Sequence, residues 1–337
     1  MNEELEKKLE LFVENKQKVA KAYVLENDLN HLISSLILTG KNKTADIDHL
    51  KEVRKILAGK ASAFSSLRYS MEMTVTAKMA VENNPQGYID DVKEVYDKIV
   101  GKRILEYHSF VLAALSIVDL GKKNDADRII AKSWDILARM KKEHPILADE
   151  YDITFTVLLA MTDKDVDTII REMEECYNYL KKELKIKADS NSIQSLCEIL
   201  LLSEGDLKEK CDRAAAIFES FKEHKMKYGS YYEFASIGAL VGLDMDKDEL
   251  VETVIETAQA MKQHKGFGAF TMDTKTRLMF AAMIVAQEVS DKKDLLYDYA
   301  VNGAVINDSV AMIIAEETAA LICCMTIAAQ SNNTYSG

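Results

Sequence analysis

The chain has 337 residues, 48% of them hydrophobic and 29% charged, and it carries a formal net charge of −12. This balance excludes a disordered chain, and the thirteen glycines and two prolines are too few for a fold with many tight turns, so we expect an almost entirely helical protein. The negative charge disfavours general binding to nucleic acid, because phosphates repel an acidic surface.

The N-terminal segment predicts a surface helix. Its first ten residues, MNEELEKKLE, are charged and lack the apolar stretch of a signal peptide. Leu5, Leu9, Phe12 and Val19 recur at helical spacing, which predicts an amphipathic helix over residues 3–25. The chain has five cysteines, an odd number, which indicates reduced thiols. We therefore expect a cytoplasmic protein.

Two kinds of helical segment alternate after residue 28. Short and nearly apolar segments such as NHLISSLIL and FVLAALSIVDL predict buried helices. Each is followed by a longer amphipathic segment that should face water on one side. The amphipathic segments share an apolar anchor that recurs every 40–42 residues, at Leu57, Ile99, Met140, Leu180, Phe221 and Met261.

This period is typical of stacked helical repeats. The sequence predicts an all-α protein, a right-handed α-solenoid-like array of about six helix–loop–helix repeats, with divergent helices capping both ends. The expected single domain covers residues 1–330. Within it, residues 1–27 form the N-terminal cap, 28–267 the six pairs and 268–330 the C-terminal cap, and residues 331–337 form a flexible tail.

The segment HKGFGAFTMDTKTRLMFAAM, residues 264–283, holds two of the few glycines. A phosphate-binding loop would need a preceding strand and a GK[ST] sequence, and neither is present. Gly266 follows the anchor Met261 by five residues, where glycine can end a helix in the left-handed conformation. We therefore predict a helix stop, followed by an apolar helix over residues 271–289.

A second apolar stretch, residues 310–329, is long enough to raise the question of a membrane span. Glu316 and Glu317 lie near its middle, and a carboxylate at the centre of a bilayer costs about 2.5–3.5 kcal/mol. We therefore expect a buried helix and no membrane span. A buried carboxylate needs a partner, and Arg277 is the candidate.

Several segments resemble one family of proteins along essentially the whole chain. They are ELEKKLELFVEN, FSSLR, EEC near Cys176, KYGSYYEF and KGFG…RLMFAAMIVA. The chain resembles a family of bacterial, mainly Firmicute, proteins that are described only as a domain of unknown function. The resemblance implies no chemistry, so it assigns no catalytic residue.

The candidate binding surface is a column of residues just before each buried helix. In a solenoid, equivalent positions line up along one edge or groove, and Tyr, Arg and His are residue types that favour contacts. The alternative is ordinary helix-start chemistry, with aromatic side chains packing between repeats. The column comprises Arg68, His108, Tyr151, Asp152, Asn191, Tyr231 and Tyr232.

A rival interpretation is a metal-dependent enzyme that acts on a diphosphate or a similar anion. Asp90, Asp91 and Glu94 in DDVKE resemble the aspartate-rich motif of all-α isoprenoid synthases, and carboxylates one turn apart can bridge Mg²⁺ ions. They fall on the water-facing side of an amphipathic helix, and no second acidic motif with the required spacing follows. This activity stays the alternative.

Cysteine residues offer one further candidate metal site. Cys176, Cys197, Cys211 and His224 fall on consecutive predicted helices, but no CxxC or HExxH pair is present. Cys176 and Cys211 occupy apolar positions of the repeat, where cysteine acts as a small hydrophobic residue. We expect no cofactor. The sequence favours a non-catalytic scaffold that binds an unidentified protein or peptide.

Overall fold

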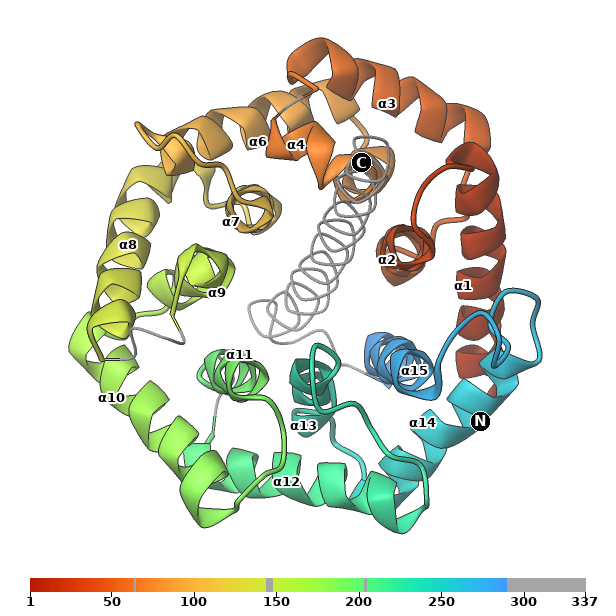
Figure 1. Cartoon of the computed structure of the whole chain (residues 1–337). Helices are drawn as coiled ribbons and strands as arrows, with labels where there is room; N and C mark the ends of the chain where they lie inside the picture. The colour runs from red at the N-terminus through yellow and green to blue at the C-terminus, as the bar shows by residue number, and fades with distance from the viewer. Residues whose placement is uncertain (64, 144–147, 203–204, 290–337) are drawn as a thin grey trace, which may run out of the picture.

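The computed structural model describes residues 1–63, 65–143, 148–202 and 205–289, and all regular structure in these ranges is helical. The helices form two concentric layers around one axis (Figure 1). The outer layer contains α1 (Glu3–Ala22), α3 (Ile47–Lys60), α6 (Pro85–Val100), α8 (Ala126–Glu143), α10 (Val166–Asn178), α12 (Leu207–Glu223) and α14 (Lys247–Lys262). The inner layer contains α2 (Asp28–Gly40), α5 (Glu72–Ala80), α7 (His108–Asp119), α9 (Ile153–Ala160), α11 (Ser190–Leu200), α13 (Gly238–Val241) and α15 (Thr274–Val289).

Hydrophobic patterning assigns each helix to its layer. Every residue of α9 is buried, as the nearly apolar segments predict for helices packed on all sides. In α8, by contrast, Ile129, Ile136 and Met140 are buried on one face, while the other face carries charged residues. All six anchors of the repeat are buried, each in an outer helix or, for Leu180, in the π-helical turn Tyr179–Glu183 that extends α10. The all-α class and the alternation of helices are thus confirmed.

Asparagine and aspartate set where many of these helices begin. The side chains of Asn2, Asn27, Asp165, Asp206 and Asp246 each accept a hydrogen bond from a backbone N–H in the first turn of the following helix. Such N-caps satisfy donors that have no partner inside the helix. A short polar loop that ends in such a cap is therefore sufficient to connect a helix of one layer to the next helix in the other layer.

The ring closes on itself, which the sequence did not indicate. An open array with caps at opposite ends was expected, but α1 packs against both α14 and α15, and α15 packs against α2 (Figure 1). The two predicted caps therefore lie side by side. α1 takes the outer position and α15 the inner position of a seventh helical pair, which is assembled from distant parts of the chain.

Aromatic rings and buried cations fasten this closure. Phe12 of α1 lies 5.9 Å from the ring of Phe267 and 5.8 Å from the ring of Phe280, measured between centroids. The Lys16 ammonium donates to the carbonyl oxygen of Gly266 at 2.9 Å and lies 4.7 Å from the centre of the Phe267 ring. Lys8 pairs with Glu288 at 3.1 Å. Apolar packing and charge-assisted hydrogen bonds thus join the first helix to the last described one.

The glycine-rich segment serves this closure. Gly266 has a φ of 89°, the left-handed conformation that ends a helix, and Phe267 is fully buried against α1. Arg277 is buried too, and its guanidinium donates to the carbonyl oxygens of Phe267 at 3.0 Å and Met272 at 2.9 Å. The helix stop is thus confirmed. Glu316 and Glu317, the expected partners of Arg277, lie outside the described residues.

Candidate binding surface

Exposed apolar side chains gather on one rim of the ring. We define this rim as the connecting segments, called loops here, that lead from an outer to an inner helix within the described residues: 23–27, 61–63, 65–71 (which contains the one-turn helix α4, Ser66–Tyr69), 101–107, 148–152, 184–189, 224–233 and 263–273. Seven of the eight large hydrophobic residues that are exposed in the described parts of the chain lie here, and the eighth is Met1. The seven are Val24, Leu25, Tyr69, Ile104, Leu105, Tyr231 and Phe270.

These seven residues form an arc because the ring is closed. They come from five loops that are consecutive around the ring, in the order 224–233, 263–273, 23–27, 61–71 and 101–107 (Figure 1). The step from the second of these loops to the third crosses the closure, where Lys16 bonds to Gly266. We call the seven residues the apolar arc. In an open array, Val24 and Phe270 would lie at opposite ends.

The opposite rim has a different character. Its loops lead from inner to outer helices and carry sequences such as GKNKTAD, ENN, GKKND and LDMD. None of the exposed large hydrophobic residues found in the described ranges lies in them. Lone exposed apolar residues are common on protein surfaces, but seven on one rim and none in the described parts of the other make this rim the candidate interaction surface.

Backbone and side-chain contacts hold the arc loops in place. The Lys275 ammonium lies over the ring of Tyr231, 5.8 Å from the ring centre. The backbone carbonyl oxygen of Tyr231 accepts a hydrogen bond from the Ser192 hydroxyl at 2.9 Å. Arg103, next to Ile104, donates to the carbonyl oxygen of Ile99 at 3.1 Å and stacks on Trp134 at 3.5 Å. Pre-ordered loops lose less conformational entropy on binding than mobile ones.

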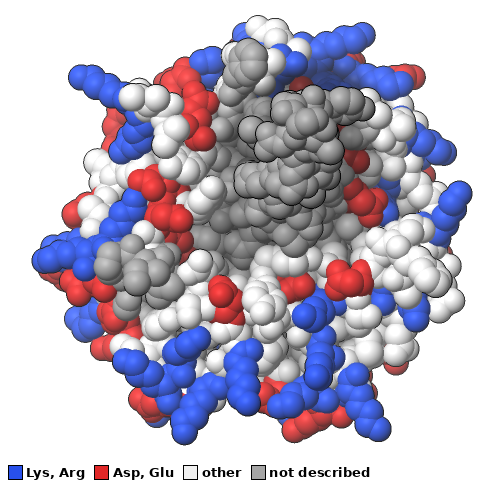
Figure 2. Space-filling model, in the orientation of Figure 1, with Lys and Arg blue, Asp and Glu red and all other residues white. Residues whose placement is uncertain are grey.

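Charged side chains of both signs lie on this face. In Figure 2, Lys and Arg side chains are most prominent at the outer edge, while Asp and Glu side chains lie both at that edge and nearer to the middle. Asp189 and Asp273 accept hydrogen bonds from backbone N–H groups in the first turns of the inner helices α11 and α15. Burial acts to raise the pKa of Asp273, but hydrogen bonds from Thr276 and Lys275 outweigh it, so the pKa is lowered and the carboxylate is charged at neutral pH.

The predicted column lies on this rim, at the starts of the inner helices, but its members differ in exposure. Tyr231 and Asn191 are exposed. Arg68 is half-buried, and its Nε lies 3.3 Å from a carboxylate oxygen of Glu72. The rest of the column is buried or half-buried. The rings of His108 and Tyr151 pack against each other with 5.1 Å between their centroids. The carboxylate of Asp152 accepts a hydrogen bond from the backbone N–H of Asp149 at 2.9 Å. The hydroxyl of Tyr232 shares a hydrogen bond of 2.5 Å with the hydroxyl of Thr276.

Sequence reasoning missed most of the apolar arc. Of the seven, the predicted column held Tyr231 alone, because an isolated hydrophobic residue in a loop is an ordinary feature of a sequence; the residues missed were Val24, Leu25, Tyr69, Ile104, Leu105 and Phe270. The signal was present: YVLEN and KRIL place paired aliphatic residues between two helices, where burial is difficult. What the sequence could not show is that these loops share one rim.

The acidic alternative site is neutralised by lysines. Asp90 pairs with Lys60 at 2.7 Å, and Lys123 lies 2.5 Å from Asp91 and 2.8 Å from Glu94. The hydrogen bonds to Lys60 and Lys123 lower the pKa of Asp90 and of Glu94, respectively. In the described parts of the chain, no three or more His, Cys, Asp or Glu side chains are grouped so that they could hold a metal ion. These three carboxylates lie on an outer helix and form ordinary surface ion pairs.

The cysteine candidate is divided by the fold. Cys176 and Cys211 meet with 3.4 Å between sulfur atoms, and the thiol of Cys197 also hydrogen-bonds to Cys176. His224 lies elsewhere, at the end of α12, where its Nδ1 bonds to the carbonyl oxygen of Ser220 at 2.9 Å. The histidine thus binds a carbonyl oxygen of the last turn of α12 and caps that helix.

Comparisons with known proteins complete the description. No helix among the described residues is long and apolar enough to cross a membrane, and the apolar stretch 310–329 lies outside those residues. No curated protein and no solved structure matches the chain. One family model does match, over residues 14–319, and its description is "Protein of unknown function (DUF4003)". Because the match covers most of the chain, this protein belongs to the DUF4003 family.

Proposed function

We propose that this protein is a non-catalytic scaffold that binds a protein or peptide partner through the rim that carries the apolar arc. The observation that carries the proposal is the arc itself: seven exposed large apolar side chains on five neighbouring loops, with none on the opposite rim among the described residues. Interfaces concentrate aromatic and aliphatic anchors in this way, within a polar surround.

The predicted column contributes the polar part of the same surface. Arg68 adjoins Tyr69, and Tyr231 belongs to both sets. Asn191 and the half-buried Tyr151 add groups that can form hydrogen bonds around the ring. Such residues would surround the apolar anchors and give specificity, while the apolar side chains give most of the binding energy.

A protein partner suits this rim better than a lipid surface or nucleic acid. Acidic side chains lie among the apolar loops, with Glu26 beside Leu25, Glu106 beside Leu105 and Asp273 near Phe270. The chain as a whole carries a charge of −12 and would be repelled by anionic lipids and by phosphates. Cytoplasmic proteins with basic and apolar surface residues fit this pattern.

Site-specific photocrosslinking tests the proposal. A photoreactive residue replaces Leu25, Ile104 or Phe270 on the apolar arc, or the exposed Lys122, Asp163 or Asp244 on the opposite rim as matched controls. In the native cell, the arc positions are expected to crosslink one common protein, and the control positions are not. Equal crosslinking from both rims would contradict the proposal.

A purified-component assay then measures the contribution of the arc. We expect the triple variant Leu25→Ser, Ile104→Ser, Phe270→Ser to bind the crosslinked partner at least about tenfold more weakly, because each apolar anchor contributes on the order of 1 kcal/mol or more. Its melting temperature should be unchanged, since all three side chains are exposed. Unchanged affinity, or binding of the unmodified protein to vesicles of anionic phospholipid in place of a protein, would refute the proposal.

A further inference from the structure

Three cysteine side chains from consecutive helices meet inside the ring wall. Cys176 lies on α10, Cys197 on α11 and Cys211 on α12, and all three are free and buried. The sulfur atoms of Cys176 and Cys211 are 3.4 Å apart, so small rotations of the two side chains would bring them to the bond distance of a disulfide, about 2.05 Å. The pair is thus positioned for a bond between two neighbouring outer helices.

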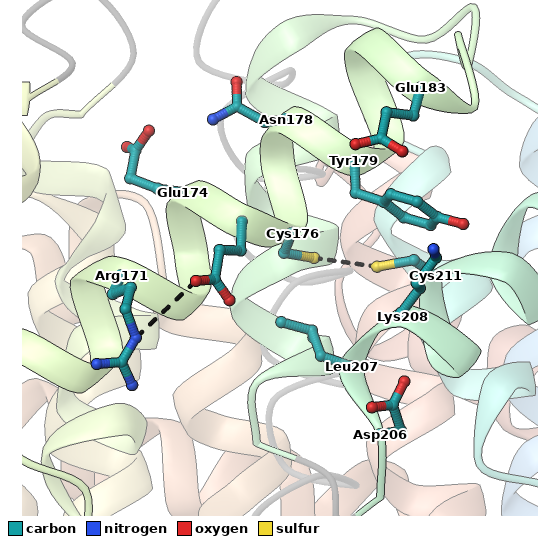
Figure 3. Close-up of a pocket in the computed structure, with 11 residues that line it drawn as sticks. Arg171, Glu174, Cys176, Asn178, Tyr179, Glu183, Asp206, Leu207, Lys208 and Cys211 are labelled. Carbon is teal, nitrogen blue, oxygen red and sulfur yellow. Dashed lines mark hydrogen bonds and ion pairs between the residues drawn. The ribbon is translucent and has the colours of Figure 1, made fainter.

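A surface pocket of about 550 Å³ adjoins this pair, and both cysteines form part of its lining. Figure 3 shows the two sulfur atoms facing each other between α10 and α12, with Glu174, Glu183, Asp206 and Lys208 around them. The pocket thus offers a space beside the sulfur atoms in which a small molecule could be held.

The pocket lining is acidic. It holds four carboxylates, those of Glu174, Glu175, Glu183 and Asp206, against two cations. One cation, Arg171, lies 3.9 Å from Glu175, and the other, Lys208, lies over the ring of Tyr179 at 4.9 Å. A concave site lined by one sign of charge attracts small molecules of the opposite sign.

Burial sets the chemistry of these thiols. The hydrogen bond with Cys176, together with burial, raises the pKa of Cys211, and burial raises the pKa of Cys197. The thiols are therefore protonated at neutral pH. Since the thiolate is the attacking species, exchange should be slow at neutral pH and become faster as the pH rises.

We propose that Cys176 and Cys211 form a dithiol that undergoes exchange with a small cationic disulfide held in this pocket. Cys176 and Cys211 are 1% and 0% exposed, so the reaction begins when a local opening of the α10–α12 contact exposes a sulfur atom to the pocket. One cysteine then loses its proton to solvent and attacks a sulfur of the small disulfide, which forms a mixed disulfide and releases one thiolate. The second cysteine, also deprotonated, attacks the bound cysteine sulfur, closes the Cys176–Cys211 bond and releases the second thiolate. Both released thiolates take protons from solvent. The two cysteines lose two electrons and the small disulfide gains them.

The bridge would link α10 to α12 across 35 residues of chain, and so join two successive helical pairs of the ring. A cross-link of this kind restricts the unfolded chain and stabilises the folded one. The alternative, that the cluster is only apolar packing, predicts that the folded protein does not react.

Cystamine, which carries two positive charges, is the probe that tests this. The full chain with Cys323→Ser and Cys324→Ser, which removes the other two thiols, is incubated at pH 8.5 with cystamine, neutral hydroxyethyl disulfide or anionic glutathione disulfide. We expect a mass loss of two hydrogens and a linked peptide that joins Cys176 to Cys211. The rate with cystamine should exceed the rate with glutathione disulfide by about tenfold or more.

Two variants and one reference reaction make the outcome decisive. Because Cys197 also contacts Cys176, the double variant Cys197→Ser, Cys211→Ser should stop at a mixed disulfide on Cys176, while Cys197→Ser alone should still form the bridge. The same three disulfides react with the chain unfolded in guanidinium chloride as the reference, and Ellman's reagent counts the thiols that remain, which gives the intrinsic rate with each disulfide. Absence of the 176–211 bridge in the folded protein would overturn the proposal, whether or not the variants fold. Equal rates with all three disulfides would overturn the role of the acidic pocket.

Discussion

Individual buried polar residues stabilise this fold through hydrogen-bond partners that the sequence alone does not identify. Arg277 donates to the loop carbonyl oxygens of Phe267 and Met272 and to the hydroxyl of Thr274, while the glutamates expected to pair with it lie outside the described residues. Lys16 binds the carbonyl oxygen of Gly266 as well as the carboxylate of Asp28, 2.9 Å away. The sequence could show that a buried cation needs acceptors, but any backbone carbonyl can serve, so the partner depends on tertiary structure.

Glu233 is a residue whose burial costs stability. It is 4% exposed, and its Oε2 has no hydrogen-bond partner among the described residues. Gly229 permits this close packing, because a Cβ at that position would collide with the carboxylate. Burial raises the pKa of Glu233, with nearby Asp273 adding to the effect and backbone N–H groups and Lys275 opposing it.

The raised pKa predicts a pH-dependent effect of Glu233→Gln. The folded state holds the proton to a higher pH than the unfolded state, so ionisation lowers stability as the pH rises above the ordinary carboxyl range. At pH 7 the melting temperature of the variant should therefore be a few degrees higher, which corresponds to a gain of about 1 kcal/mol in the free energy of unfolding. The gain should vanish near pH 4, which thermal melts across this range would show. An equal gain from Glu219→Gln, an exposed control, would contradict the assignment.

At the scale of elements, much of the fold was readable from the sequence. The first helix was expected over residues 3–25 and spans Glu3–Ala22, and the apolar helix expected over 271–289 spans Thr274–Val289. Periodic burial explains this success, because the core face of each helix must repeat every three to four residues. The π-helical turn at Tyr179–Glu183 was not predicted, since it does not change which residues are apolar.

The closing helix pair depends on Phe12, which stacks on Phe280 and packs at a tilt against Phe267. We expect Phe12→Ala to lower the free energy of unfolding by about 3–5 kcal/mol, the usual cost of removing a buried phenylalanine. It should also increase hydrogen exchange in α1 and α15. Phe155→Ala in α9, equally buried, is the matched control.

The pattern of exchange separates the two variants. Phe155→Ala should destabilise the protein similarly but leave exchange in α1 no faster than the global loss of stability requires. If Phe12→Ala produced the same uniform pattern as Phe155→Ala, the closure would not be a separate contact region. Denaturant unfolding and exchange mass spectrometry measure the two quantities.

At the scale of the whole molecule, the sequence predicted the repeat but not the ring. Hydrophobic periodicity identifies helical pairs, whereas the curvature of their stack follows from a small rotation between neighbouring pairs. That rotation depends on side-chain shapes at every interface and has no simple signature in sequence. The candidate site was accordingly predicted as residue types at the starts of the buried helices, and the arc, which spans the closure, was missed.

Ring closure is the central claim. It places α1 beside α15 as one helical pair, and it brings the five loops of the apolar arc next to one another around the ring. Zero-length carbodiimide crosslinking tests it most directly, because Lys8 and Glu288 lie 3.1 Å apart while 280 residues separate them in sequence. We predict a linked peptide that joins Lys8 to Glu288 within one molecule, as shown by mixing isotope-labelled and unlabelled protein. Absence of that link, together with an elongated particle in small-angle X-ray scattering, would contradict the closed ring.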